Sequence, residues 1–251
     1  MVVKAEIEIR ECVSLEALAG CVALQHEVFA LPEIEISPVR HFVVTKNAGG
    51  FTLGAFANDE LIGFVLSVPA FLRGERAFYS HMTAVRQDFQ GAGIGAALKW
   101  AQRRRSLELG VKFVKWTFEP CKARNAFFNL EKLGAVVREY HANFYGIDYS
   151  TASTGGKPIG LASDRLFAEW DLESNKVCNL AEGRKYVETL EAERTIAVPV
   201  DWSSLVISDP EKALAEQLRV RREFEAALAD GLICRGFVRG GETPHYLLYR
   251  G

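Results

Sequence analysis

The sequence has little that would mark a membrane or secreted protein. Its longest strongly apolar run, residues 61–72, contains Gly63 and Pro69 and is too short to cross a bilayer. The opening stretch MVVKAEIEIR alternates charged and apolar residues, so it lacks the apolar core of a signal peptide. We therefore predict a cytoplasmic protein with no membrane partner.

Neither cysteine usage nor charge indicates a metal, redox or nucleic-acid site. The five cysteines are scattered without a CxxC pair, and their odd number argues against a disulfide framework. Lys and Arg number 30 against 32 Asp and Glu, so the formal net charge is −2 and no basic excess exists for nucleic acid. The triplet RRR at 103–105 is interpreted as a solvated helix face. The sequence thus predicts no metal and no nucleic-acid partner.

What the chain does contain is typical of a globular protein with a sizeable core. Of its 251 residues, 49% are hydrophobic and 25% are charged, which fits one large domain or two small ones. The small, polar stretch STASTGGKP at 150–158 is the best linker candidate. We predict a first domain at 1–149, a linker at 150–158, and a C-terminal α/β extension at 159–251 that packs on the first domain.

Patterns of apolar residues predict a mixed α/β fold. Before the linker they predict strands at 5–13, 51–57, 60–72, 77–85, 112–118, 135–140 and 144–149, with a hairpin turn at Asn58-Asp59. Helices are predicted at 14–30, 37–46, 94–109 and 123–134. Beyond the linker we expect strands at 164–172 and 195–200, helices at 180–193 and 209–231, and a closing hairpin at 233–240 and 244–250.

Three glycines at alternate positions, in the stretch QGAGIGA at 90–96, stand directly before a predicted helix. Glycine inside an element costs roughly 0.5–1 kcal/mol against alanine, so this cluster indicates either a flexible turn or a ligand close to the main chain. The dinucleotide pattern fits poorly, because a polar break separates the strand from the first glycine and no acidic residue follows about twenty positions on. The phosphate loop of nucleoside triphosphatases requires Gly-Lys-Ser/Thr, where this chain has Ala-Ala-Leu.

A strand, a polar turn, Gln90-x-x-Gly93-x-Gly95 and a helix together resemble the acyl-CoA signature of the GNAT acetyltransferases. The order of elements is similar over roughly residues 5–149. The resemblance implies a GNAT fold, with a central mixed, mostly antiparallel sheet flanked by helices, and acetyl-CoA as cosubstrate. Backbone amides from 90 to 96 can point at a pyrophosphate, and the dipole of the following helix adds partial positive charge there.

The CoA contacts that the resemblance implies fall in three segments. In the glycine-rich loop they are Gln90, Gly91, Ala92, Gly93, Ile94, Gly95 and Ala96. The preceding strand, at Thr83, Ala84 and Val85, is expected to pair with the pantetheine arm as an extra strand would. Asn125 resembles the CoA-binding asparagine of the family, although it stands two residues closer to Gly134 than the family spacing. It is otherwise an ordinary residue at a helix start.

Two side chains are candidates for the general base. His81 stands three residues before Ala84, where a GNAT relative also has a histidine. A histidine with a pKa of about 6.5 can accept a proton from an ammonium group, but a buried structural histidine fits the position equally. Glu119 ends the next strand beside Pro120. It is either a base made effective by burial or a solvated carboxylate.

The usual GNAT general acid, a tyrosine in the helix after this strand, is missing. The family pattern Tyr-Glu-Lys-x-Gly-Phe is replaced by LEKLGA, with Leu130 and Ala135 at the matching places. Tyr145 and Tyr140 are substitutes on the following strands, and Tyr145 is the catalytic candidate. Either tyrosine can instead be a packed aromatic with a satisfied hydroxyl.

The resemblance, with these residues, implies an N-acetyltransferase that acts on a primary amine of a small molecule or peptide, with the backbone amide near Val85 polarising the thioester carbonyl. The segment 29–50, which should line the acceptor pocket, has no diagnostic charge cluster. The missing tyrosine favours a different class as the alternative, a non-catalytic acyl-CoA-binding sensor or partner-binding module. A homodimer is compatible with the sequence.

We expect calorimetry to show binding of CoA or acetyl-CoA and no binding of NAD, because the loop offers amides without the acidic residue that binds the NAD ribose. At 100 times its dissociation constant, CoA should stabilise the fold by about 2.7 kcal/mol. Absence of CoA binding at millimolar concentration would contradict this prediction.

Overall fold

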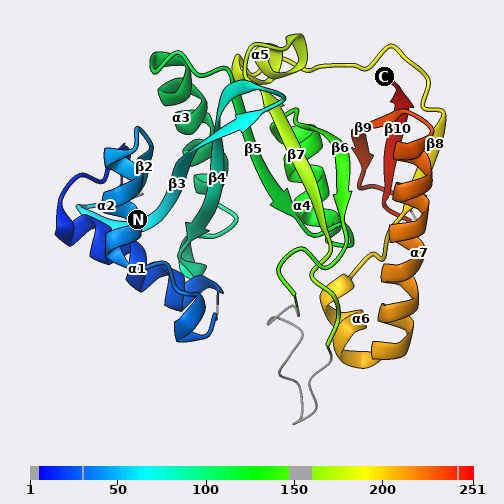
Figure 1. Ribbon diagram of the computed structural model, residues 1–251, viewed down its shortest axis with the longest axis horizontal. Helices are drawn as coiled ribbons and strands as arrows, with labels where there is room; N and C mark the ends of the chain where they lie inside the picture. The colour runs from blue at the N-terminus through cyan, green and yellow to red at the C-terminus, as the bar shows by residue number, and fades with distance from the viewer. Residues whose placement is uncertain (1–5, 30, 147–159, 242) are drawn as a thin grey trace, which may run out of the picture. The chain divides into compact units, whose positions relative to one another are not determined.

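The computed structural model describes residues 6–29, 31–146, 160–241 and 243–251 (Figure 1). The chain forms two compact units, Met1–Lys115 and Trp116–Gly251. The division falls inside strand β5 (Phe113–Phe118), so the first unit holds only the first half of this strand. The linker predicted at 150–158 lies outside the described residues, and the predicted domain limits stay a prediction.

The first unit is built on an antiparallel sheet in the order β1-β2-β3-β4, to which the start of β5 adds a parallel strand. Its strands are β1 (Ile7–Glu11), β2 (Phe51–Ala57), β3 (Glu60–Leu72) and β4 (Glu75–Val85). Its helices are α1 (Leu15–Phe29), α2 (Val39–Asn47) and α3 (Ile94–Glu108), with 3-10 turns at Glu33–Glu35 and Gln87–Phe89. The mixed, mostly antiparallel sheet flanked by helices is confirmed.

Local sequence explains where several of these elements begin or end. Asn58 and Asp59, with φ of 47° and 65°, form the two-residue turn between β2 and β3 that these residue types favour. Ser14 caps α1, since its Oγ accepts from the Ala17 N–H at 3.2 Å. Pro38 stands at the N-cap of α2, directly before its first helical residue.

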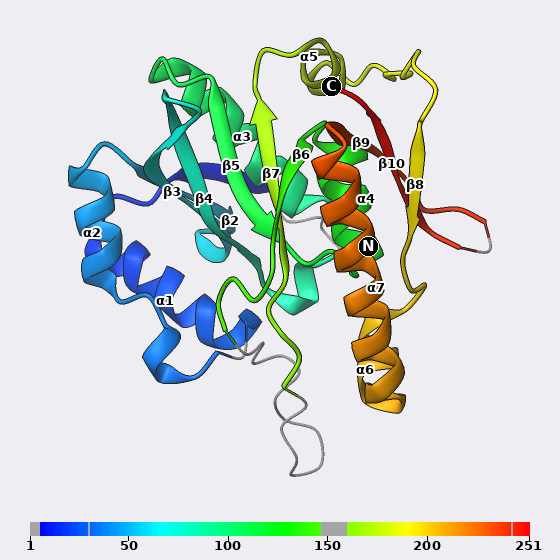
Figure 2. The same ribbon diagram turned by 45° about the vertical axis from the view of Figure 1, so that its right-hand side comes forward.

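Helices cover both faces of this sheet (Figure 2). On one face, Cys21 of α1 and Phe42 of α2 pack in one buried cluster with Leu66 of β3. Successive strand residues point to opposite faces, so Ser67 points away from this cluster. The Ser67 Oγ accepts from Gln102 Nε2 of α3 at 2.7 Å. α3 therefore lies on the face opposite to α1 and α2.

A buried lysine lies between α3 and the sheet. Lys99 is 3% exposed, and its Nζ donates to Ser80 Oγ at 3.0 Å and to Gln102 Oε1 at 2.7 Å. Ser80 of β4 and Ser67 of β3 are register partners, so this polar network ties both strands to the helix. Burial lowers the pKa of Lys99 well below its usual range.

The second unit contains strands in the order β7-β6-β9-β10-β8. They are β6 (Val136–His141), β7 (Arg165–Asp171), β8 (Arg194–Ala197), β9 (Leu232–Val238) and β10 (His245–Arg250). Its helices are α4 (Ala123–Phe127), a π-helical turn (Phe128–Lys132), α5 (Asn175–Ala181), α6 (Trp202–Ser208) and α7 (Pro210–Ala229). Both β7 and β9 pair with β6, so residues from either side of 150–158 share one sheet.

Aromatic rings form the centre of the second unit. Phe224 of α7 and Phe237 of β9 each lie 4.9 Å from the ring of Tyr246 of β10, centroid to centroid. Tyr246 is fully buried, and its hydroxyl donates to the Pro120 carbonyl oxygen at 2.6 Å. The bond satisfies the polar end of this ring. It also fixes β10 to the segment that follows β5.

The second unit corrects two predictions. The helix predicted at 180–193 is wrong, because α5 begins earlier, where Ser174 Oγ accepts from the Val177 N–H, and Gly183 with φ of 72° follows its end. The strand predicted at 144–149 is wrong over 144–146, which form a turn, and its remainder lies outside the described residues. α6 was not predicted, although Asp201 caps it by accepting from the Ser204 N–H at 3.0 Å.

Replacing the buried lysine, Lys99→Met, should remove a dependence of stability on pH. The pKa of Lys99 is lowered in the folded state, so between that pKa and the ordinary value of about 10.4 only the unfolded chain binds the proton. Stability contributed by this group therefore rises with pH, by up to about 1.4 kcal/mol per pH unit. Urea unfolding at several pH values from 7 to 9.5 should show a steeper rise for the wild type than for the variant.

The exposed lysine variant Lys46→Met is the matched control. The buried thiols of Cys121 and Cys234 have raised pKa values and affect all three proteins alike, so they cancel in the comparison. Parallel pH dependence of the wild type and Lys99→Met would refute the prediction.

Candidate active site

A β-bulge at His81 interrupts β4. Leu66 of β3 pairs with Met82, but the next residue, Ser67, pairs with Ser80, so His81 is the extra residue on β4. Ser80 faces α3, whereas Met82 packs with the core under α1 and α2. The bulge therefore shifts the register of the strand just before its carboxyl end.

Beyond the bulge, one edge of β4 is open within the first unit. The parallel pairing of β4 with the start of β5 covers Ala77, Phe78 and Tyr79. No other strand in the described part of the first unit pairs with residues 80–85 on that edge. An open edge can accept an extended ligand as an added strand.

The backbone N–H and C=O groups of only some β4 residues point toward this open edge. The Arg86 N–H donates to the Ile62 oxygen of β3 at 2.8 Å. Neighbouring residues direct their backbone groups to opposite edges, so the N–H and C=O groups of Thr83 and Val85 point away from β3. Ala84, which is fully buried, turns its backbone groups toward β3. Of the three predicted strand residues, Thr83 and Val85 thus offer groups to a ligand.

The glycine loop depends on backbone conformations that favour glycine. Gly91 and Gly93 have φ of 82° and 85°, and a Cβ at either would meet nothing within 4 Å. Gly95 lies in the first turn of α3, and a Cβ there would approach only Val85 Cγ2, at 3.9 Å. The turn therefore requires glycine at 91 and 93. At 95 the missing side chain leaves open space before the helix.

The N-terminus of α3 directs backbone donors into this space. The first bond within the helix runs from the Ala97 N–H to the Gly93 oxygen at 3.0 Å, so the N–H groups of 94–96 have no acceptor within the helix. The N-cap residue, Gly93, has no side chain that could cap them. These donors and the helix dipole favour an anion. Ile94 contributes only its backbone, since its side chain is 5% exposed and part of the core.

Side chains fasten the loop to the strand. Gln90 Nε2 donates to the Val85 oxygen at 2.9 Å, and the Gln90 N–H donates to the Gln87 oxygen at 3.2 Å. Arg86 forms two bonds with Asp88, Nε to Oδ1 at 2.8 Å and Nη2 to Oδ2 at 3.1 Å. Gln90 therefore shapes the loop, and the amides available to an anion begin after it.

His81 lies beside a second histidine in the first unit. Its Nε2 lies 3.4 Å from Ser37 Oγ, and its ring centroid lies 5.6 Å from that of His41 and 6.4 Å from that of Tyr79. Although His81 is exposed, desolvation by surrounding atoms lowers its pKa, and the charge of His41 lowers it further. The ring is therefore neutral at pH 7, the form that accepts a proton.

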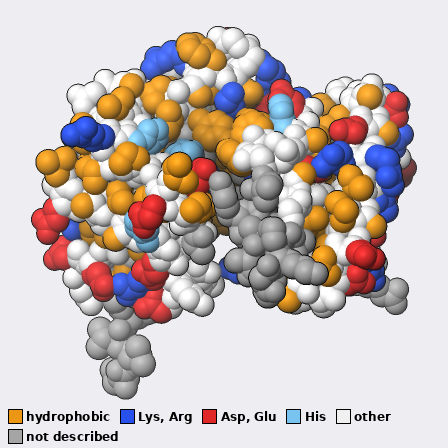
Figure 3. All heavy atoms as spheres, turned by 60° about the horizontal axis from the view of Figure 1, so that its bottom comes forward, with side chains coloured by type: hydrophobic (Ala, Val, Ile, Leu, Met, Phe, Trp, Pro, Cys, Tyr) orange, Lys and Arg blue, Asp and Glu red, His pale blue; other side chains and the backbone are white. Residues whose placement is uncertain are grey.

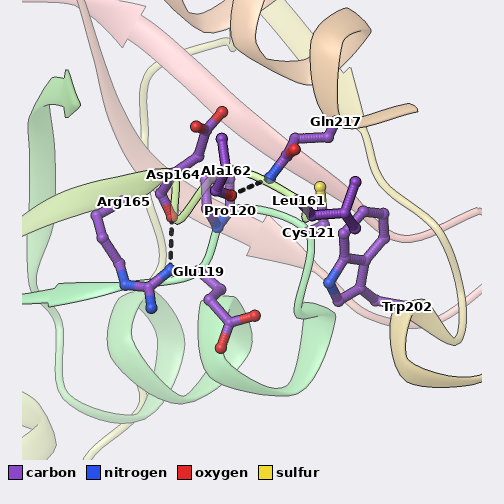
Figure 4. A pocket seen from close by; sticks show the side chains of 9 residues that line it. All are labelled: Glu119, Pro120, Cys121, Leu161, Ala162, Asp164, Arg165, Trp202 and Gln217. Atoms are coloured by element: carbon purple, nitrogen blue, oxygen red, sulfur yellow. Dashed lines mark hydrogen bonds between the residues drawn. The ribbon is translucent and has the colours of Figure 1, made fainter. Parts of the chain in front are cut away.

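Glu119 lies in the second unit, in the wall of a small pocket (Figure 4). The pocket is lined by Glu119, Pro120, Cys121, Leu161, Ala162, Asp164, Arg165, Trp202 and Gln217. Glu119 is 18% exposed at its side chain and pairs with Lys122, Oε1 to Nζ at 2.5 Å. Figure 4 shows its carboxylate pointing away from Gln217. To act as a base, Glu119 would have to share or leave this ion pair.

Tyr145 belongs to the second unit as well. Its hydroxyl lies 3.2 Å from Thr117 Oγ1 of β5, and the residue is 53% exposed. The Arg165 guanidinium lies over the ring, 5.3 Å from its centroid. Since Thr117 precedes Glu119 by two residues, both predicted catalytic residues of this unit lie near the carboxyl end of β5.

Three other positions considered in the sequence analysis, Leu130, Tyr140 and Asn125, also lie in the second unit. Leu130, at the place of the family tyrosine, is fully buried in the π-helical turn. Tyr140 donates to Asp164 Oδ2 at 2.5 Å, and burial together with this bond raises its pKa. Arg221 holds the same carboxylate with two bonds of 2.7 and 2.9 Å. Asn125 is half-buried in α4.

The predicted residues thus form two groups. His81, the edge residues Thr83 and Val85, and the loop at 91–96 lie together in the first unit, whereas Glu119, Asn125 and Tyr145 lie in the second. Sequence reasoning missed Ser37 and His41, which approach His81 from another part of the chain. No local pattern marks them, because Ser37 is 44 residues away from His81.

A strand with an open edge, a glycine loop and a helix N-terminus define an α/β domain with an anion-binding loop. Residues 22–135 match the model of the acetyltransferase (GNAT) family, so the resemblance of the chain to that family is confirmed. Among curated proteins, none matches this chain in sequence.

Solved structures support the same fold. The ribosomal-protein-S18-alanine N-acetyltransferase from Escherichia coli has a TM-score of 0.51 and 16% identity, over 74% of this chain and 99% of that one. A structure from Acinetobacter baylyi ADP1, assigned as an acetyltransferase, has a TM-score of 0.54 and 17% identity, over 70% and 97%. A chain of the NatC complex bound to Gag peptide and CoA has a TM-score of 0.51 and 16% identity, over 66% and 98%. At these identities the likeness shows the fold alone.

The described residues contain no group of three or more His, Cys, Asp or Glu side chains placed to hold a metal ion. No helix in the described ranges is long and apolar enough to cross a membrane.

The substitution Gly95→Val should abolish CoA binding and leave the fold intact. Gly95 has room for a Cβ, with Val85 Cγ2 at 3.9 Å, so the added side chain enters the space before the helix amides. The exposed residue Ala97 of the same helix gives the matched control, Ala97→Val. Calorimetry should show at least a hundredfold weaker CoA binding for Gly95→Val alone, with unchanged circular dichroism. Equal affinity in both variants would rule out this cradle.

Proposed function

We propose that the chain is an N-acetyltransferase that transfers an acetyl group from acetyl-CoA to a primary amine of a small molecule or peptide. The observation that carries the proposal is the glycine loop between the open edge of β4 and the N-terminus of α3. Gly91 and Gly93 turn the chain there, and Gly95 leaves space before helix amides that have no acceptor in the helix. Such a cradle suits a pyrophosphate.

The residues present fit acetyl-CoA. Amides of the loop and of the first turn of α3, residues 91–96, would hold the pyrophosphate, and the edge groups of Thr83 would pair with the pantetheine arm. Acetyl-CoA supplies the thioester: the amine nitrogen forms a bond to the carbonyl carbon, and the carbon–sulfur bond breaks. The Val85 N–H, on the open edge, would polarise the carbonyl oxygen. Asn125 is a further proposed contact.

Proton transfer is the part of the reaction that falls to side chains. His81 is the proposed base, because its lowered pKa keeps the ring neutral and able to accept the amine proton at pH 7. Glu119 is the second candidate for this role. The leaving sulfur needs a proton, for which Tyr145 is the proposed donor, since its hydroxyl is on an exposed side chain.

Two structural relatives favour an amine acceptor. The E. coli protein acts on an alanine of a ribosomal protein, and the NatC structure contains a peptide and CoA. These acceptors make a peptide amine the first class to try. A panel of peptides and small amines, with release of the CoA thiol as the readout, tests the choice.

A second candidate function rests on Leu130. Because a fully buried leucine occupies the place of the family tyrosine, the chain could bind acyl-CoA without catalysis, as a sensor or partner-binding module. The same panel separates the two functions. Thiol release with any amine supports the enzyme, and tight CoA binding without release supports the module.

The substitution His81→Ala should lower the turnover rate roughly 10²–10⁴-fold, the typical contribution of a general base. The lowered pKa of His81 places the acidic limb of kcat/KM below pH 6.5, the ordinary histidine value, and the loss should shrink at high pH, where the amine loses its proton unaided. Rates measured from pH 5 to 9 check both expectations, with His245→Ala as a histidine control.

Two further variants assign the remaining roles. If Glu119 is the base, Glu119→Gln should show a loss of roughly 10²–10⁴-fold and His81→Ala should not. Tyr145→Phe should slow thiol release if Tyr145 is the acid. Wild-type rates in all three variants, on a substrate that the protein turns over, would show that other groups or water carry the protons.

A further inference from the structure

A glutamine in the core of the first unit holds the segment that reaches His81. Gln25 of α1 is 0% exposed. Its Nε2 donates to the Ser37 carbonyl oxygen at 3.1 Å, and its Oε1 accepts from the Ser37 N–H at 2.9 Å. One side-chain amide therefore pairs with both backbone groups of a single residue, as a neighbouring strand would.

The polar side chain at this position needs an explanation. An amide buried without partners costs free energy, and an apolar residue of similar size would pack without that cost. Cys21 and Leu24, which are neighbours of Gln25 on α1, are both buried apolar residues. Gln25 thus packs less favourably than an apolar residue would, but its two hydrogen bonds fix the position of Ser37.

The hydroxyl of Ser37 then meets the proposed base. Ser37 Oγ lies 3.4 Å from His81 Nε2, a long contact of the kind that often tightens only when substrate binds. The other side chains around the ring are His41 of α2, edge-on at 5.6 Å, and Tyr79 of β4 at 6.4 Å. In Figure 3, histidine side chains lie among hydrophobic ones over this unit. Of these three neighbours, only Ser37 is within hydrogen-bonding distance of His81 Nε2.

We propose that Gln25 and Ser37 are positioning residues for His81, which rests on the role of His81 in the proposed function. When His81 accepts the amine proton, its ring becomes an imidazolium with a donor at both nitrogens. Ser37 Oγ is placed to accept from Nε2 and so to stabilise the charged ring, while Nδ1 serves the acceptor amine. Gln25 keeps the hydroxyl in place by holding both backbone groups of Ser37.

The test uses Ser37→Ala, which removes the hydroxyl and keeps the Gln25 contacts, and Ser37→Thr, which retains a hydroxyl. Gln25→Met removes both contacts at similar volume, and Glu16→Gln, at the exposed start of α1, is the control. The pKa of His81 is measured by NMR titration without CoA, and kcat/KM is measured against pH. We expect Ser37→Ala to lower the pKa of His81 by about half a unit or more, since a lost hydrogen bond destabilises the charged ring.

The kinetic limb should move with the NMR value. In Ser37→Ala and Gln25→Met, kcat should fall about tenfold at pH 7 with KM for acetyl-CoA unchanged, and Ser37→Thr should restore most of the rate. An unchanged His81 titration in Ser37→Ala would overturn the proposal, whether or not Gln25→Met folds. If the wild type turns over no amine, the proposed function fails, and the NMR titration still decides whether Ser37 acts on His81.

Discussion

The register shift at His81 is the constraint on which the candidate site depends. If His81 were paired as an ordinary strand residue instead of forming the bulge, every position after it on β4 would point to the opposite face, because side chains alternate strictly along a strand. Met82 and Ala84 would then face α3 instead of the core under α1 and α2. The polar network of Lys99, Ser80 and Gln102 lies directly beside the bulge. It fixes the strand on one side of the irregularity.

The same shift relates the edge of β4 to the glycine loop. Val85 presents its backbone to the open edge and its Cγ2 atom to the side of Gly95, 3.9 Å from where a Cβ would stand. Gln90 returns to the Val85 oxygen, so the loop that begins α3 is anchored on the residue that ends β4. The short loop between Val85 and α3 thus fixes where the strand edge and the helix amides lie relative to each other. Their relative placement within the first unit follows from the local sequence.

This is why the sequence predicted the cradle and missed the surroundings of His81. Local features depend on residues that are close together along the chain, so residue spacing and backbone preferences can predict them. The strands of the first unit, the Asn58-Asp59 turn and the glycine motif are of this kind. Ser37 reaches His81 across 44 residues, and nothing in the spacing of either marks the pair. Gln25 is a polar residue at an apolar position of α1. This exception is visible in the sequence, but its reason appears only when the contact with Ser37 is known. The helix predicted at 180–193 failed for a smaller reason, since Ser174 and Gly183 were not recognised as the limits of α5.

Because the family tyrosine is missing, the surroundings of the other tyrosines decide where a proton donor should be sought. Leu130 fills its place in the core of the second unit and leaves no polar atom there. The Tyr140 hydroxyl is committed to Asp164, and burial with that bond raises its pKa, which makes transfer of its proton to a thiolate harder. Tyr145 differs, because the residue is about half exposed, 53%, and its hydroxyl lies 3.2 Å from Thr117 Oγ1. Of these positions, Tyr145 has the more accessible hydroxyl, so a proton donor from the protein should be sought there before any other tyrosine.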